Sequence, residues 1–168
     1  MASQHNLRVL LLGLAVSLLV VIPVVALAED EVASQPLAVI VHKSSPVESI
    51  AISDLRKMLT GALRTWPDST TVVLVQQPDT SPSQKRMLQL VLKTNPAAYN
   101  RSLLRAQFQG GQVPTIKVIN SDTNAIAFVW NVPGALSLVD PTMAAASSHV
   151  KVLKVDGKLP SEPGYALR

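Results

Sequence analysis

Apolar residues along the chain follow two patterns, continuous runs and runs with helical spacing. Apolar runs rich in β-branched residues predict buried strands at 36–43 and 71–75. A mostly apolar stretch predicts a third strand at 135–140, and a valine-rich stretch, whose alternation is imperfect because of its two lysines, predicts a fourth at 150–157. Apolar residues three and four positions apart predict helices at 53–61, 81–93, 95–111 and 121–131. A short strand or an extended loop is expected at 113–120, no clear element at 141–148, and a loop-like tail at 159–168. This alternation predicts a mixed sheet with helices on its faces, in one α/β domain at 37–158.

Polar residues before each helical pattern supply the expected start signals. The predicted N-cap residues are Ser53, Ser81, Asn95 and Ser121. Pro82 follows Ser81 as a first helical residue, and Gly61 is the expected stop of the helix before it. Trp66 and Trp130 are expected to be core or edge packing residues rather than ligand platforms, with Trp130 facing inward, because a chain with 4% aromatic residues needs them there.

The N-terminal stretch has the composition of a secretory signal. A short basic start is followed by the apolar run 9–28, which ends in Ala26-Leu27-Ala28 before Glu29. We therefore expect a signal peptide at 1–28, a flexible segment at 29–36, and a periplasmic or secreted protein. The alternative is an uncleaved membrane anchor, because the apolar run is long enough to span a bilayer. Contact with a membrane is expected only if this leader is retained.

Composition excludes several kinds of chemistry. The chain has no cysteine, so disulfides, cysteine nucleophiles and cysteine-rich zinc sites are impossible. Its charge of +4 suits an anionic partner, but no run of five basic residues predicts binding to nucleic acid. His42 and His149 lie far apart in the sequence without a zinc-binding motif, so no metal site is expected. No nucleophile elbow or carboxylate pair is present, and we expect neither catalytic activity nor a cofactor.

Several pieces between residues 37 and 140 resemble, in their order and spacing, the phosphate-binding proteins of bacterial ABC importers. These pieces are the strand "LAVIVHK", Leu55 to Met58, Gly61, Trp66, the turn at 76–83 and the stretch Gly134 to Val139. The family belongs to the type II periplasmic binding proteins, which have two α/β lobes, and the stretch resembles the second lobe. The resemblance implies an α/β fold, a single lobe with a mixed sheet flanked by helices, since no counterpart of the other lobe precedes Leu37.

The resemblance also implies a ligand site at the strand-to-helix turn. The family's arginine falls at Gln77, its serine at Ser81, its glycine at Pro82 and its threonine at Ser83. A helix start offers unpaired N–H groups and a partial positive charge, which together bind oxyanions. The candidate ligand-binding residues are Gln77, Ser81, Ser83, Gln84 and Lys85. Without the arginine, a charged bidentate contact to phosphate is lost and weak binding is expected.

Two other interpretations remain open. Ser81 can cap the helix with its own side chain, in which case the turn is only a turn. A single lobe can also have lost its ligand and serve as an envelope interaction module, for which an exposed apolar patch would be the sign. The expected partners are phosphate or a similar small anion, with ABC importer components or a second copy of the chain as further candidates.

Overall fold

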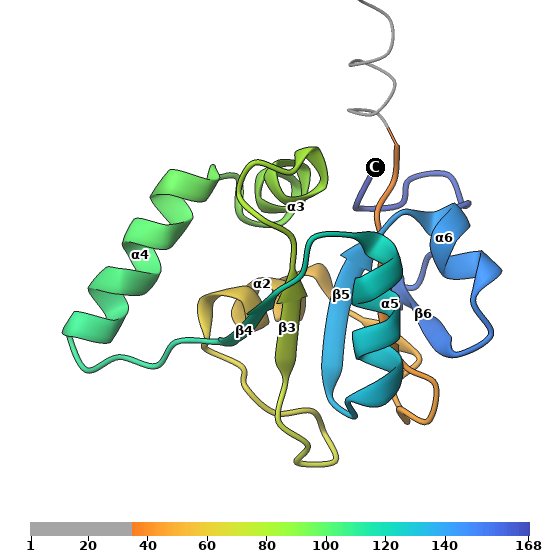
Figure 1. Cartoon of the computed structure of the whole chain (residues 1–168), viewed down its shortest axis with the longest axis horizontal. Helices are drawn as coiled ribbons and strands as arrows, with labels where there is room; N and C mark the ends of the chain where they lie inside the picture. The colour runs from red at the N-terminus through yellow and green to blue at the C-terminus, as the bar shows by residue number, and fades with distance from the viewer. Residues whose placement is uncertain (1–34) are drawn as a thin grey trace, which may run out of the picture.

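Six strands form one mixed sheet in the order β2-β6-β1-β5-β3-β4. The structure is a computed structural model that describes residues 35–168, so the predicted signal peptide and nearly all of the segment 29–36 lie outside the described residues. The strands are β1 (Ala38–His42), β2 (Ser49–Ile50), β3 (Val73–Gln76), β4 (Thr115–Val118), β5 (Ala135–Val139) and β6 (Val150–Val155). The expected α/β architecture, a mixed sheet flanked by helices, is confirmed (Figure 1).

Helices cover both faces of this sheet. They are α2 (Ile52–Thr60), α3 (Pro82–Leu92), α4 (Pro96–Phe108), α5 (Asp122–Asn131) and α6 (Pro141–Ala146). Alternate residues of β1 point to opposite faces, because side chains on a strand alternate. Val39 and Val41 join the core under α2 and α3, whereas Ala38 and Ile40 join the core under α5 and α6.

The directions of the strands determine at which edge of the sheet the helices begin. β3 pairs in parallel with both β4 and β5, whereas β1 pairs antiparallel with β5 and β6. Each of the three parallel strands leads into a helix: β3 into α3, β4 into α5 and β5 into α6. Because the carboxyl ends of parallel strands meet at one edge, the N-terminal ends of these three helices lie at the same edge of the sheet (Figure 1).

Most of the predicted helix signals are found where they were expected. Asn95 accepts a hydrogen bond from the N–H of Ala98 and caps α4, and Ser121 accepts one from Asn124 and caps α5. Gly61 ends α2 with a φ of 82°. The prediction of Ser53 as a cap is wrong.

The start of α2 is set by a residue from another part of the chain. The helix begins at Ile52, one residue before Ser53, and the N-cap residue is Ala51. The carboxylate of Asp156, in the turn after β6, accepts a hydrogen bond from the N–H of Ile52 at 3.1 Å. Because this distant carboxylate satisfies a free donor of the first turn, the helix needs no cap of its own.

The two tryptophans have different surroundings. Trp66 is buried, and its indole N–H donates to the carbonyl oxygen of Gly134 at 2.9 Å. Trp130 is 47% exposed, so the expectation that it faces inward is wrong. Helix α5 buries Ala125 and Val129, and the next position is rotated by about 100° away from that stripe. The Trp130 ring stacks on the ring of His149, with 4.2 Å between the ring centroids.

Residues 159–168, expected to be a loop-like tail, contribute to the core without forming a helix or a strand. Tyr165 and Leu167 are buried in the core under α2 and α3. The hydroxyl of Tyr165 donates to the carbonyl oxygen of Leu37 at 2.8 Å, and the N–H of Leu37 donates to the carbonyl oxygen of Leu167 at 2.9 Å. Burial raises the pKa of the Tyr165 phenol.

Among the described helices, none has the length and hydropathy needed to cross a membrane.

Candidate functional site

The candidate turn lies at the sheet edge where α3, α5 and α6 begin. Gln77 follows β3 directly, and its side chain donates a hydrogen bond to Oδ1 of Asp122, the first residue of α5. Its Oε1 accepts a hydrogen bond from the hydroxyl of Ser81 at 2.5 Å. The other oxygen of Asp122 accepts the N–H of Asp140 at 2.8 Å. These contacts form one chain of hydrogen bonds that joins the starts of the three helices.

This chain of contacts determines what Ser81 does. Ser81 is the N-cap residue of α3, with extended backbone angles, but its side chain makes no capping hydrogen bond. Its hydroxyl is committed to Gln77 instead. The interpretation in which Ser81 caps its own helix is therefore wrong, because the Gln77 amide competes successfully for the hydroxyl.

The first turn of α3 retains free backbone donors. The N–H of Ser81 donates to the carbonyl of Pro78, and the helical bonding starts with Lys85 N–H donating to the carbonyl of Ser81. Among residues 35–168, the N–H groups of Ser83 and Gln84 have no hydrogen-bond acceptor. Pro82 has no N–H. Two adjacent donors therefore remain at the positive end of this helix.

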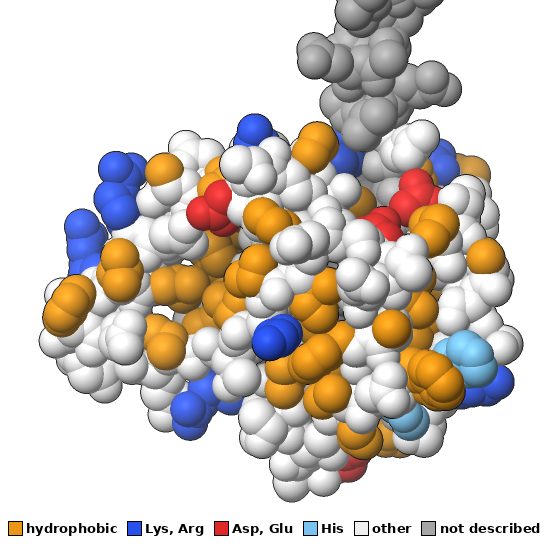
Figure 2. Space-filling model, viewed as in Figure 1, with side chains coloured by type: hydrophobic (Ala, Val, Ile, Leu, Met, Phe, Trp, Pro, Cys, Tyr) orange, Lys and Arg blue, Asp and Glu red, His pale blue; other side chains and the backbone are white. Residues whose placement is uncertain are grey.

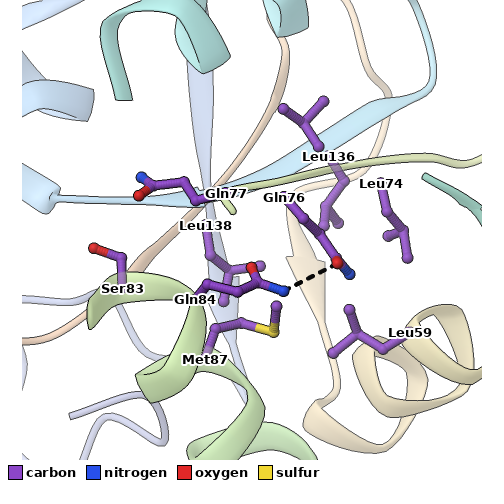
Figure 3. Close-up of a pocket in the computed structure, with 10 residues that line it drawn as sticks. Leu59, Leu74, Gln76, Gln77, Ser83, Gln84, Met87, Leu136 and Leu138 are labelled. Atoms are coloured by element: carbon purple, nitrogen blue, oxygen red, sulfur yellow. Dashed lines mark hydrogen bonds between the residues drawn. The ribbon is translucent and has the colours of Figure 1, made fainter. Parts of the chain in front are cut away.

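The Gln84 side chain points away from the turn and into the core (Figure 3). Gln84 is buried, and its Nε2 donates to Oε1 of Gln76 at 3.0 Å. The amide of Gln76 reaches the hydroxyl of Tyr99, which donates to the carbonyl oxygen of Leu59 at 2.8 Å. Burial raises the pKa of the Tyr99 phenol, so this hydroxyl stays a donor. Gln84 can therefore meet a ligand only through its backbone.

The turn has little enclosed space and an open side. A cavity of about 10 Å³ lies between Gln77, Ser83 and Gln84 and the core leucines, which is room for about one water molecule (Figure 3). On the outer side, Ser83 and Lys85 line a mostly apolar surface hollow with Arg86, Leu37 and Asp140. The exposed Lys85 ammonium and the partly buried Arg86 guanidinium contribute positive charge there. An anion would approach from this open side.

Two carboxylates at this edge, Asp122 and Asp140, were not among the predicted site residues. Both occupy positions where an acidic residue stabilises a helix start: Asp122 is the first residue of α5, and Asp140 is the N-cap of α6. The signal was present in the sequence, since Asp122 follows the predicted cap Ser121 and Asp140 ends a predicted strand. Their negative charge offsets part of the field that three helix starts produce.

Asp140 gives the stability of the fold a pH dependence. The Thr142 hydroxyl and the N–H groups of Thr142 and Met143 donate to its carboxylate and hold the pKa of Asp140 below its usual range, although burial acts against them. A depressed pKa stabilises the fold above the unfolded value of about 3.9 and ceases to do so as the pH falls through the folded value. We expect wild type to be more stable than Asp140→Asn at pH 6, and the difference to decrease as the pH falls through the folded pKa of Asp140, measured by urea unfolding. A difference that does not change with pH would contradict this.

No protein-family model matches the chain, and no curated protein sequence matches it. Solved structures do match. They include an ABC-type phosphate transport receptor from Vibrio cholerae, with a TM-score of 0.63 at 17% identity over 79% of this chain and 53% of that one. PstS from Borrelia burgdorferi gives 0.64 at 15% identity, over 79% and 53%. A phosphate-binding protein from Stenotrophomonas maltophilia gives 0.54 at 14% identity, over 75% and 40%.

The fold of the matching part of the chain is similar to that of type II periplasmic binding proteins. The chain spans about half the length of the first two matching structures, 53% of each. Two of these neighbours are named for phosphate, one as a phosphate transport receptor and one as a phosphate-binding protein. The resemblance inferred from the order of the sequence pieces is confirmed at the level of the fold.

Proposed function

We propose that this periplasmic-binding-protein lobe is exported, is not an enzyme, and binds phosphate or another small oxyanion weakly at the start of α3. The observation that carries the proposal is the pair of free N–H groups on Ser83 and Gln84, beside the Ser83 hydroxyl and the Lys85 ammonium. Backbone donors at a positive helix end are suited to oxyanions. The phosphate-binding names of the structural neighbours support the same ligand class. Components of an ABC importer are the proposed partners.

Asp122 limits the affinity and affects the choice of anion. Its carboxylate holds the Gln77 side chain, so an anion beside Gln77 meets a negative charge nearby. A carboxylate repels a fully ionised oxyanion such as sulfate, but it accepts a hydrogen bond from an oxyanion that still carries a proton, such as hydrogen phosphate. We therefore place phosphate ahead of sulfate, with a dissociation constant of about 1 mM, or about 4 kcal/mol of binding free energy.

Titration with phosphate tests this site. The amide resonances of residues 81–86 are expected to shift at millimolar phosphate and to shift less with sulfate at equal ionic strength. Ser83→Pro should abolish the shifts, because it removes one free N–H and the hydroxyl at a first-turn position that tolerates proline. Ala97→Pro is the matched control, since Ala97 also follows the first-position proline of a helix, α4. Unmoved resonances in the wild type would overturn the proposal.

A second candidate function is an envelope interaction module that has lost its ligand. The observation that favours it is the exposure of large apolar residues on α4 and β4: Leu104 is 52% exposed, Phe108 88% and Val118 56%. Apolar residues gathered on a surface are typical of sites that bind other macromolecules. This candidate does not require the helix-start site to be occupied.

A further inference from the structure

The edge of the sheet at β4 is open. Among the described strands, β4 pairs only with β3, in parallel, and it ends the strand order on that side. The N–H of Ile119 donates to the carbonyl of Gln76 on β3. Because backbone groups alternate along a strand, the N–H and C=O groups of Ile116 and Val118 point away from β3. An unpaired strand edge of this kind is a template for one further strand.

The two faces of β4 differ in character. Val118 is paired with Gln76 and lies on the same face as Ile116, which packs against the core under α2 and α3. Lys117 is paired with Val75, which belongs to the core under α5 and α6, so its exposed ammonium lies on the opposite face. A strand added beside β4 would have apolar neighbours on one face and a positive charge on the other.

Helix α4, which precedes β4 in the chain, also carries exposed apolar residues. It packs chiefly against α3, and Tyr99 is its one buried residue. Leu104 and Phe108, one turn apart, remain exposed. Figure 2 shows hydrophobic side chains on α4 and between α4 and the sheet, with Lys and Arg side chains around them. Helix α4 thus adds exposed apolar residues to the segment that carries β4.

The charged side chains of the segment that carries α3, α4 and β4 are all basic. Residues 80–121, which contain α3, α4 and β4, include six Lys and Arg and no Asp or Glu. Arg101 and Arg105 are exposed on α4. Asp79, just before this segment, accepts a hydrogen bond from Asn100, which lies in the half of α4 away from Phe108. Such a segment favours a negatively charged partner and steers its approach.

We propose that β4 binds an extended segment of a partner protein in which acidic and apolar residues alternate. The segment adds a strand to the sheet, placing its apolar side chains beside Val118 and its carboxylates beside Lys117. A second copy of this chain fits poorly, because pairing β4 with β4 would bring together two lysines and two basic segments. A lipid surface offers negative charge but no backbone to pair with Ile116 and Val118. The inference rests on the interaction-module candidate and is independent of oxyanion binding.

Synthetic peptides test the inference. The probes are ten-residue peptides of alternating Val and Glu, of alternating Val and Lys, and of Glu alone, each added to the full chain as purified from its host. We expect the Val-Glu peptide to bind, and the amides of Ile116 and Val118 to become protected from hydrogen exchange. The other two should bind at least tenfold more weakly, because each lacks one of the two complementary features.

Two variants with a matched control identify the surface. Lys117→Glu should weaken the Val-Glu peptide about fivefold and strengthen the Val-Lys peptide, since an exposed ion pair contributes less than one decade. Val118→Pro should abolish protection by removing an outward N–H that the pairing with β3 does not use. Lys154→Glu, an exposed lysine on β6 at the other end of the sheet, should change neither peptide's binding.

The outcomes distinguish whether the partner segment is acidic from whether this surface binds a partner at all. Three results would overturn the proposal that the partner is an acidic segment. They are equal binding of the Val-Lys peptide, a dimer that protects Ile116 and Val118, and binding to phosphatidylglycerol vesicles alone. Each of these results would leave the surface as an interaction module. A monomer that binds no peptide and no vesicle at millimolar concentration would overturn the inference and the module candidate together. Phosphate-induced shifts at residues 81–86 would be unaffected in every case.

Discussion

Gly134→Ala is expected to destabilise the fold by about 3 kcal/mol. Gly134 has a φ of +86°, a left-handed angle that costs about 1–2 kcal/mol for a residue with a Cβ. An added Cβ would lie 2.3 Å from the carbonyl oxygen of Thr71. Overpacking of this kind costs a further 1–3 kcal/mol or so. The glycine cannot move aside, because its carbonyl accepts the Trp66 indole at 2.9 Å and the Val73 N–H at 3.1 Å.

Gly157→Ala separates the cost of the left-handed backbone angle from the cost of the close contact. Gly157 has a similar φ of +81°, but no atom lies within 4 Å of the position its Cβ would take. Its substitution should therefore cost only the backbone term, about 1 kcal/mol. Urea unfolding of the two variants measures the difference. Equal losses of unfolding free energy would show that the close approach to Thr71 does not determine the cost of Gly134→Ala. The backbone at Thr71 would then have moved to make room for the new methyl group.

Gln77→Arg is expected to raise the affinity for phosphate by one to two decades. Gln77 already sits between Ser81 and Asp122, at the edge where three helices begin. A guanidinium there can pair with the Asp122 carboxylate and still direct N–H groups at an anion, since arginine has five donors. It also replaces a neutral amide by a charged donor, which contributes about 1.5–3 kcal/mol. Calorimetric titration of wild type and variant with phosphate measures the change.

The control for this variant is Gln107→Arg. Gln107 is exposed on α4, away from the turn, so the substitution adds the same charge without the geometry. We expect its effect to be less than threefold and to disappear at high salt, because exposed charges are screened beyond a Debye length. Equal gains in both variants would mean that net charge, rather than the position of Gln77, governs anion binding.

The buried strands and most helix boundaries could be predicted from the sequence because they depend on local patterns. β1 is apolar up to His42 and β5 is apolar except for Ser137; both strands are covered by helices on both faces and are buried almost throughout. The caps Asn95 and Ser121 act on their own helices, three residues away. Such signals involve neighbours in the chain, and tertiary contacts leave them unchanged.

Features that depend on distant residues could not be predicted. The start of α2 is decided by Asp156, about a hundred positions along the chain, and the hydroxyl of Ser81 is taken by a glutamine that is itself held by Asp122. At the candidate site, residue types suggested donors at positions 77–85, but the direction of the Gln84 side chain depends on the buried partner Gln76. The sequence pattern could locate the turn, whereas the partners of its side chains required the fold.

The hydrogen bonds that join Leu37 to Leu167 and to Tyr165 bring the two ends of the described chain to one corner of the body (Figure 1). Anything fused before Gln35 and anything fused after Arg168 would leave from that same corner. A second lobe appended to either end would therefore be attached at this same corner. Short linkers joining the ends should likewise be tolerated, which makes the lobe a suitable substrate for circular permutation.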